Sequence, residues 1–379
     1  MTYKSKFGFG CMRLPQTDKN NPGMIDQELF NEMVDIYMKK GFNYFDTSYA
    51  YHNGMSETAI RKAVVERYPR ESFRICDKMP TWALTSEEDN DKFVNEMLER
   101  LGIDYFDVFL IHNINRPWIK NAKNANTFEY VKKMKEDGVA KQIGFSFHEK
   151  ADLLKELLDE YGEIFDVALL ELNYLDWEDP SIESHKCYDL CVEHGLDIYV
   201  MEPLKGGVIV NPSDEIKNDF KEFDPDKSIA SFAIRFCASL EHVKVVLSGM
   251  TTMEDLMDNC NTYENFEVLT DSEHAFLEKM AEKLNSTLAV PCSECRYCIE
   301  VCPEMIPIDE YFHLFNTSKN QPESNIYRLY FDKLEDEKVP LDNCTYCGTC
   351  IDHCTQKIDI PEELENVSKH FQEGFSPYG

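Results

Sequence analysis

Short, almost wholly apolar runs alternate with longer segments of helical periodicity from residue 7 to about residue 265. This alternation is typical of parallel strands that are covered on both faces by helices. Eight such runs in one continuous series favour a closed (β/α)8 TIM barrel over an open sheet. The expected strands are FGFGCMRL (7–14), NYFDTS (43–48), FRICDKM (73–79), DVFLIH (107–112), QIGFSF (142–147), DVALLELNY (166–174), DIYVMEPL (197–204) and VKVVLSG (243–249).

The amphipathic stretches between these runs begin and end at residues suited to helix termini. Asp26, Ser56 and Ser86 each precede such a stretch, and their side chains can cap exposed backbone amides. Three helices are expected to stop just before a glycine, in KKG (39–41), EDG (136–138) and EHG (193–195). A doubly wound dinucleotide-binding sheet is the alternative, but Gly8 and Gly10 are not followed by a third glycine that opens a helix.

Charge and apolar content narrow the classes of partner. The chain has 39 basic and 70 acidic side chains and a net charge of −31, so nucleic acid would be repelled. No segment approaches the roughly 18 consecutive apolar residues that a membrane span needs. Of 14 cysteines, six are scattered as in a protein kept reduced, and we expect a cytoplasmic location.

The remaining eight cysteines form two dense runs near the C-terminus. TDSEHAFLEKMAEKLNS (270–286) predicts a helix that leads into the first run, so we expect a barrel domain over 1–285 and a small α-helical domain over 286–379. Each run has the C-x2-C-x2-C-x3-C spacing of bacterial ferredoxins. The eight cysteines are Cys292, Cys295, Cys298, Cys302, Cys344, Cys347, Cys350 and Cys354.

Ferredoxin spacing predicts two 4Fe-4S clusters, because three thiolates of one run hold one cluster and the fourth reaches the other. One set is Cys292, Cys295, Cys298 and Cys354, and the other is Cys344, Cys347, Cys350 and Cys302. Structural zinc is the alternative, but zinc sites are usually built from two separate pairs of ligands. The intervening segments YFHLF (311–315) and NIYRLYFDKL (325–334) are expected to be helices packed against the clusters.

Polar residues also stand at or just beyond the ends of three expected barrel strands. Asp46, Lys78 and His112 close strand runs, and Tyr51 follows in a loop. Each alone has an ordinary structural explanation, but together they suit the protonation of a carbonyl oxygen that has received hydride. Lys78 would lower the pKa of the Tyr51 phenol, Asp46 would hold the ammonium group, and His112 would donate a hydrogen bond to the carbonyl oxygen.

These residues lie within motifs that resemble those of the aldo/keto reductase family, and the resemblance covers nearly the whole chain. The motifs are FDTSYAYHNGMSE (45–57), KMP (78–80), DVFLIHN (107–113), GVAKQIGFSFH (138–148), LNYLD (172–176), MEPLKGG (201–207) and VLSGMTTMEDLMDN (246–259). The chain is most similar to the branch with a C-terminal ferredoxin-like domain that carries two 4Fe-4S clusters. The resemblance implies a nicotinamide cofactor and a catalytic tetrad of Asp46, Tyr51, Lys78 and His112, with Tyr51 as the acid.

The resemblance also implies where the cofactor binds, with some departures from the family pattern. Leu169 replaces the usual glutamine that holds the nicotinamide, and Asp255 stands where an arginine would bind a 2'-phosphate. A carboxylate there favours NADH over NADPH, while a flavin remains an alternative. The implied cofactor contacts are Ser146, Met201, Leu204, Lys205, Gly206, Gly207, Gly249, Met250, Thr251, Asp255, Asp258 and Asn259.

The leading functional hypothesis is an oxidoreductase that reduces an aldehyde, ketone or sugar carbonyl with a nicotinamide cofactor. A nicotinamide moves electrons in pairs, whereas each cluster takes one. The clusters are therefore expected to be structural, to sense oxygen or to pass electrons to a redox partner protein. One alternative is a ferredoxin-type electron carrier or redox sensor whose barrel is a binding module. Another is a reductase that couples a flavin to the clusters.

Overall fold

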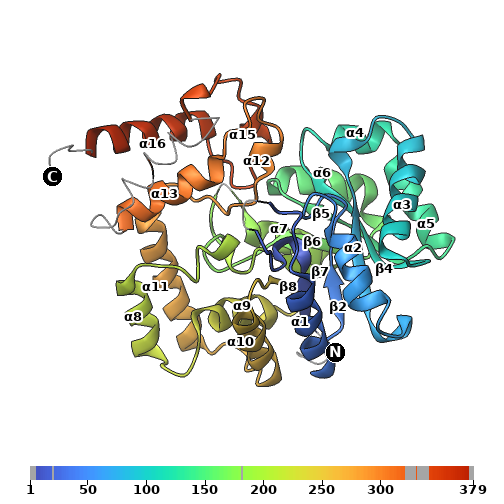
Figure 1. Ribbon diagram of the computed structural model, residues 1–379, viewed down its shortest axis with the longest axis horizontal. Coiled ribbons are helices and arrows are strands. Elements are labelled where there is room, and N and C mark those ends of the chain that lie inside the picture. The colour runs from blue at the N-terminus through green and yellow to red at the C-terminus, as the bar shows by residue number, and fades with distance from the viewer. Residues whose placement is uncertain (1–5, 19–20, 181, 321–329, 331–340, 375–379) are drawn as a thin grey trace. The chain divides into compact units, whose positions relative to one another are not determined.

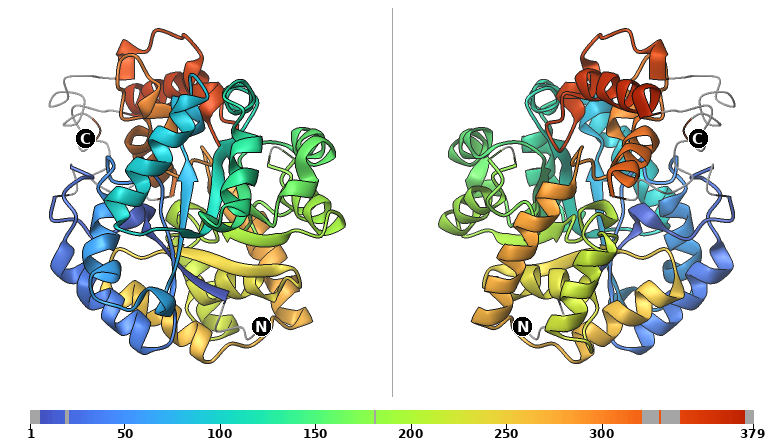
Figure 2. Two further views of the ribbon diagram at one scale, coloured as in Figure 1. Left: turned by 90° about the vertical axis from the view of Figure 1, so that its right-hand side faces the viewer. Right: turned by 90° about the vertical axis from the view of Figure 1, so that its left-hand side faces the viewer.

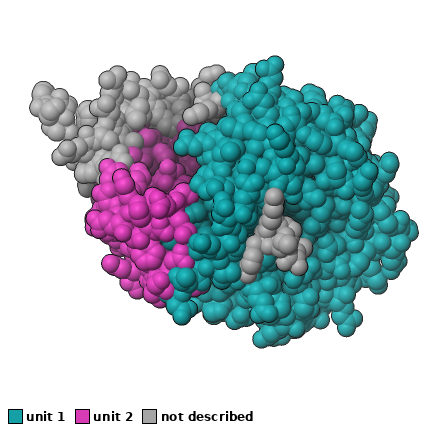
Figure 3. Space-filling model, turned by 90° about the horizontal axis from the view of Figure 1, so that it is seen from below, with its two compact units in different colours: residues 1–178, 183–203, 230–271 teal, residues 179–182, 204–229, 272–379 magenta. Residues whose placement is uncertain are grey.

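A computed structural model describes residues 6–18, 21–180, 182–320, 330 and 341–374 of the 379-residue chain. The chain divides into two compact units, which Figure 3 distinguishes by colour. The first unit comprises residues 1–178, 183–203 and 230–271, and the second comprises residues 179–182, 204–229 and 272–379. The segment 204–229 therefore folds with the C-terminal part of the chain.

Eight parallel strands of the first unit close into a barrel in chain order, which confirms the predicted fold class (Figure 1). The strands are β1 (Phe7–Gly10), β2 (Tyr44–Asp46), β3 (Arg74–Met79), β4 (Phe106–Ile114), β5 (Ala140–Phe147), β6 (Val167–Glu171), β7 (Asp197–Met201) and β8 (Val243–Gly249). Helices lie around the outside of these strands (Figure 2). This arrangement explains why the strand runs are apolar almost throughout.

The strand ends differ from the sequence expectation where the backbone turns. β8 has the predicted bounds, but β1 stops at Gly10 because Cys11–Arg13 forms a 3-10 turn. β7 stops at Met201, since Glu202 has a φ of 56° and Pro203 follows. Apolar residues beyond a strand can be buried without belonging to it, so hydrophobicity alone overestimates the length of these two strands, whereas β4 and β5 are longer than expected.

The helices are α1 (Gln27–Lys39), α2 (Ser56–Ile60), α3 (Glu88–Leu101), α4 (Ile119–Asn124), α5 (Thr127–Glu136), α6 (Ala151–Tyr161), α7 (Ser184–Glu193), α8 (Asp214–Phe223), α9 (Ile229–Ser239), α10 (Met253–Glu264), α11 (Asp271–Thr287), α12 (Tyr297–Glu300), α13 (Ile308–Asn320), α15 (Thr349–His353) and α16 (Ile360–Gly374). Asp26 caps α1 as predicted, accepting the Leu29 amide at 3.0 Å. The caps predicted at Ser56 and Ser86 are wrong. Ser56 is the first residue of α2, and its hydroxyl accepts a hydrogen bond from Thr47. α3 begins at Glu88, and there the Asp89 carboxylate accepts the Ser86 amide.

Side chains fill the barrel interior, so the barrel is a packed core rather than a pore. The interior layer consists of Tyr44, Cys76, Val108, Leu110, Val167, Leu169, Tyr199, Val245 and Leu247. Register keeps neighbouring strands aligned, with Asp46 of β2 beside Cys76 of β3. The carboxyl ends of the strands therefore meet at one end of the barrel, where polar groups can converge.

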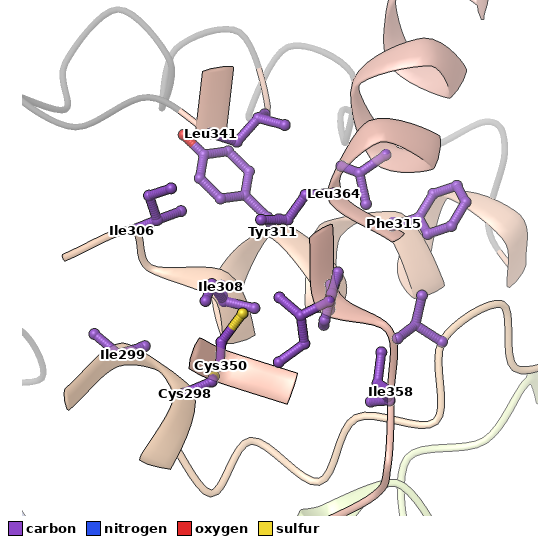
Figure 4. Packing of buried hydrophobic residues seen from close by; sticks show 14 of the residues in the cluster. Cys298, Ile299, Ile306, Ile308, Tyr311, Phe315, Leu341, Cys350, Ile358 and Leu364 are labelled. Atoms are coloured by element: carbon purple, nitrogen blue, oxygen red, sulfur yellow. The ribbon is translucent and has the colours of Figure 1, made fainter. Parts of the chain in front are cut away.

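The second unit has its own buried core, formed by residues of α12, α13, α15 and α16 and of the described loops beside them (Figure 4). The segment YFHLF lies in α13 as predicted, with Tyr311 and Phe312 buried. The helix predicted over 325–334 lies outside the described residues, apart from Tyr330. Among the helices that the structure describes, none combines the length and apolar character that a membrane span requires.

Candidate functional site

The ends of β2 and β3 bring Asp46 and Lys78 into a buried ion pair. Lys78 Nζ lies 2.5 Å from Asp46 Oδ1 and donates a second hydrogen bond, of 2.6 Å, to the Thr47 carbonyl. Burial raises the pKa of Asp46 and the ammonium group opposes that rise, while the carboxylate keeps the pKa of Lys78 above its usual value despite burial. The short contact favours the charged pair, as predicted for the group that orients the lysine.

Tyr51 and His112 lie beside this ion pair. Lys78 Nζ is 4.9 Å from the centroid of the Tyr51 ring, and the Tyr51 and His112 ring centroids are 6.1 Å apart, edge to face. The four residues singled out in the sequence therefore gather at the carboxyl ends of β2, β3 and β4. Trp82 adds an aromatic wall, with its ring centroid 5.1 Å from that of His112.

The protonation of Tyr51 differs from the sequence expectation. Burial raises the pKa of Tyr51 well above its usual value, and the nearby Asp46 carboxylate raises it further. The pKa of the phenol in the protein alone is therefore raised on balance, and the lowering effect of Lys78 stays a prediction. Tyr51 is a neutral phenol in this state, which is the form that can give up a proton.

His112 is a neutral imidazole. Burial, followed by the charge of Lys78, holds the pKa of His112 well below its usual range. Its Nδ1 lies 3.0 Å from Ser48 Oγ. If the Ser48 hydroxyl donates to Nδ1, the proton of the neutral ring is on Nε2, where it can be donated to a ligand.

Several polar groups among the predicted cofactor contacts of the first unit form hydrogen bonds with other residues of that unit. Ser146 Oγ accepts a hydrogen bond from the backbone amide of Asn113 at 2.7 Å, and the side-chain amide of Asn259 donates to Ser248 Oγ at 2.8 Å. Asp255 forms a capping box with Thr252 at the start of α10, accepting its amide at 2.9 Å. The remaining members are Met201 at the end of β7, Gly249 at the end of β8, Met250 and Thr251 directly after β8, and Asp258 in α10.

The predicted pyrophosphate loop, Leu204 to Gly207, belongs to the second unit. Lys205 is buried, and its ammonium group donates to the side-chain oxygen of Gln356, which is also buried. Gly206 has a φ of 64°, and a Cβ at this position would lie 1.9 Å from the Ser293 carbonyl oxygen. Its lack of a side chain is therefore already required by packing within this unit.

The cysteine module brings together the first set of thiols predicted from the spacing. Cys298 is buried near Cys295, Cys292 and Cys354, and burial followed by these neighbours raises its thiol pKa. Cys292 likewise lies near Cys295 and Cys354. Cys354 of the second run therefore lies near Cys292 and Cys298 of the first run, and Cys295 lies near the same two thiols.

The second set is arranged reciprocally. Burial raises the pKa of the Cys350 thiol to about 12, with further contributions from Cys344, Cys302 and Cys347. All four line one pocket, together with Pro303, Glu304, Ile306, Ile308, Thr345, Gly348, Pro361 and Leu364. Four thiols around an otherwise largely apolar pocket suit an iron–sulfur cluster in donor chemistry. Within the described residues, no three His, Cys, Asp or Glu side chains are arranged to hold a single metal ion.

Several residues of the site were not singled out from the sequence. Ser48 orients His112, and the Arg13 side chain packs beside Gly249, with Thr251 Oγ1 donating to the Arg13 carbonyl at 3.2 Å. Asp77, a charged residue directly before Lys78 in the third strand run, was a signal that could have been used. It is buried directly before Lys78.

Comparison with known proteins agrees with this architecture. Residues 6–282 match the model of the aldo/keto reductase family, and residues 291–358 match that of a 4Fe-4S dicluster domain. An aldo-keto reductase of Mycolicibacterium vanbaalenii is 27% identical over 254 residues, or 66% of this chain and 82% of the relative. The NADH-specific methylglyoxal reductase of Escherichia coli is 25% identical over 205 residues, or 49% of this chain and 60% of the relative.

Solved structures show the same fold. The holo form of an aldo-keto reductase from Bacillus halodurans is similar with a TM-score of 0.58 at 22% identity, covering 74% of this chain and 91% of that chain. An aldo-keto reductase from Klebsiella pneumoniae in complex with NADPH has a TM-score of 0.56 at 17% identity, covering 73% and 90%.

The closed barrel, its polar tetrad and the cysteine module define a barrel oxidoreductase with an attached iron–sulfur domain. The chain belongs to the aldo/keto reductase family. It is a nicotinamide-dependent carbonyl oxidoreductase with a 4Fe-4S domain, as the sequence predicted.

Proposed function

We propose that this protein is an NADH-dependent carbonyl reductase in which Tyr51 protonates the substrate oxygen. The observation that carries the proposal is the buried Asp46–Lys78 ion pair beside the Tyr51 ring, with His112 at the same end of the barrel. A phenol that is partly removed from water is a weak acid by itself, and the adjacent ammonium group stabilises the phenolate that remains after proton transfer. Asp46 keeps that ammonium group in place.

When bound, the reduced nicotinamide supplies the hydride that adds to the carbonyl carbon. Residues of the chain then stabilise and protonate the oxygen on which negative charge develops. Tyr51 transfers its proton to this oxygen, and His112 Nε2 donates a hydrogen bond to it. Because both groups are neutral beforehand, the proton is available at neutral pH without prior ionisation of the site.

A preference for NADH is supported by Asp255. Its carboxylate accepts the amides of Thr251 and Thr252, so it is held at the start of α10. A fixed negative charge there would disfavour the 2'-phosphate of NADPH. Titration of cofactor fluorescence is expected to show tighter binding of NADH, and tighter binding of NADPH would contradict the assignment.

For the C-terminal module we propose two 4Fe-4S clusters on the two cysteine sets described above. Cys298, Cys350 and Cys354 are buried in the core of this module, whereas Cys347 is exposed. An exposed ligand favours exchange of electrons with a redox partner protein through the second set. Iron and sulfide analysis of anaerobically purified protein should give about eight of each per chain.

Replacement of Tyr51 by Phe tests the catalytic proposal. This variant keeps the ring but lacks the proton, so reduction of a carbonyl probe such as methylglyoxal should fall by about two to four orders of magnitude. NADH binding and the visible spectrum of the clusters should not change. Retention of the activity would show that another group is the acid.

Replacement of Cys347 by Ala separates reduction from electron relay. If the clusters only stabilise the fold, NADH-dependent reduction should persist in folded, partly depleted protein. If they carry electrons to the substrate, reduction should fall together with the absorbance of the second cluster. Replacement of the buried, scattered Cys260 by Ala is the control for loss of a thiol outside the two cysteine sets, because this thiol lies in α10 of the first unit.

A further inference from the structure

Two fully buried carboxyl groups meet behind the strand that carries Lys78. Glu57 of α2 and Asp77 of β3, here called the carboxyl pair, are both 0% exposed and lie within hydrogen-bonding reach of each other. Successive residues of a strand point to opposite faces, so Asp77 projects towards the covering helices while Lys78 faces the barrel interior. The pair thus lies outside the tetrad and directly behind it.

One oxygen of each carboxyl group is bonded to a neighbour. Glu57 Oε2 accepts Arg100 Nη1 at 2.8 Å, and Asp77 Oδ1 accepts the backbone amide of Lys78 at 2.8 Å. Within the described residues, the other two oxygens, Glu57 Oε1 and Asp77 Oδ2, have no donor. Two ionised carboxylates cannot satisfy each other, whereas one added proton gives each orphaned oxygen a partner.

The charges around the carboxyl pair lead to the same conclusion. Arg100 from α3 is the cation in direct contact with it, and it also lies 3.6 Å from the more exposed Glu96. On the barrel side, Lys78 is already paired with Asp46. In the described part of the chain, one cation in contact with the pair balances one negative charge, so the buried pair is balanced when it carries a single proton.

We propose that Glu57 and Asp77 share one proton and act as a positioning pair for Lys78, so that loss of this proton weakens Tyr51 as an acid. The inference rests on the proposed role of Tyr51. The Asp77 carboxylate lies close enough to raise the pKa of both Tyr51 and Lys78. An additional negative charge in the pair would therefore disfavour the phenolate that proton transfer produces.

The dependence of reduction on pH tests the proposal in the anaerobic holoenzyme. In the wild type, kcat/KM for a carbonyl probe should fall as the pair loses its proton with rising pH. Replacement of Asp77 by Asn mimics the protonated partner and cannot ionise. The falling limb should then move upward by about one pH unit or more. Glu57→Gln should shift it in the same direction, while Glu96→Gln is the control and should leave it in place.

An independent readout does not require turnover. Infrared difference spectra of the full chain should show the carbonyl stretch of a buried carboxylic acid at neutral pH, and this band should be absent in Asp77→Asn and Glu57→Gln. A band that persists in both variants would overturn the shared proton. A uniform loss of activity at every pH, with an unchanged limb, would reduce the pair to a packing role. Inactivity of the wild type with every carbonyl, but with the band present, would reject the proposed function and the effect on Tyr51 while leaving the shared proton intact.

Discussion

Replacement of Gly206 by Ala tests the packing of the loop after β7 within the second unit. Gly206 has a φ of 64°, and its missing Cβ would lie 1.9 Å from the carbonyl oxygen of Ser293 and 2.6 Å from its carbonyl carbon. Gly138 provides a matched control, because its φ is 77° and nothing lies within 4 Å of its missing Cβ. Both substitutions introduce the same left-handed strain, but only one introduces an overlap.

The structure separates the two costs. An alanine in the left-handed region costs about 1–2 kcal/mol, partly offset by a stiffer unfolded chain, so Gly138→Ala should lower the free energy of unfolding by about 1 kcal/mol. Relief of the overlap at Gly206 requires the Ser293 carbonyl to retreat by roughly 1.5 Å to reach an ordinary contact. Backbone displacement of this kind costs about 1–3 kcal/mol more. We therefore expect about 2–4 kcal/mol for Gly206→Ala.

The assay is anaerobic urea denaturation followed by circular dichroism, with iron content measured on the same preparations. Ser293 directly follows Cys292 in the chain, so its displacement should also reduce iron retention in Gly206→Ala but not in Gly138→Ala. Equal losses of stability in the two variants, with full iron content in both, would refute the reasoning.

Three further predictions follow from buried charges. Burial raises the pKa of Glu57 from 4.5 to about 9 and that of Asp77 from 3.8 to about 7, so the folded state binds these protons more tightly than the unfolded state. The stability gained from this tighter proton binding is complete below about pH 4 and lost as pH rises towards 9. Urea denaturation at a series of pH values should show a shallower decline in Asp77→Asn. Lys78→Met leaves the buried Asp46 carboxylate without its partner, so the free energy of unfolding measured by thermal denaturation should fall by about 3–5 kcal/mol. Part of this loss should be recovered when that carboxylate is neutralised as well. Gln356→Ala removes a hydrogen-bond acceptor of Lys205 and should lower the free energy of unfolding by about 1–3 kcal/mol, whereas exposed Gln372→Ala should have little effect.

The fold was predictable because a parallel barrel leaves a strong pattern in the sequence. Every expected strand exists, since strands covered on both faces need nearly continuous apolar runs. The boundaries were less predictable because apolar residues also fill the loops at the strand ends, as at Cys11–Arg13. Helix caps depended on local geometry. Asp26 caps α1, whereas Ser56 is the first residue of α2 and its hydroxyl forms hydrogen bonds with Thr47 and Cys11.

The convergence of the four candidate site residues was predictable for a topological reason. The carboxyl ends of parallel strands meet at one end of a barrel, so polar residues that end separate runs converge there. The protonation of Tyr51 was not predictable, because the sequence identified its cation but not the depth of its burial. The partner of Asp77 was equally hidden, since Glu57 reads as an ordinary residue of an amphipathic helix until α2 is placed over β3.

The loop from Leu204 to Gly207 shows why a motif has to be interpreted with its surroundings. Its sequence suits phosphate, with one lysine and two glycines, yet Lys205 donates to Gln356 and Gly206 packs against Ser293. Gln356 lies two residues after Cys354 and Ser293 one residue after Cys292, so both contacts end beside thiols of the same cysteine set. For Lys205 to bind a phosphate in this arrangement, its ammonium group would have to share or leave Gln356. The conformation of this loop is therefore set by the same packing that holds the first cysteine set.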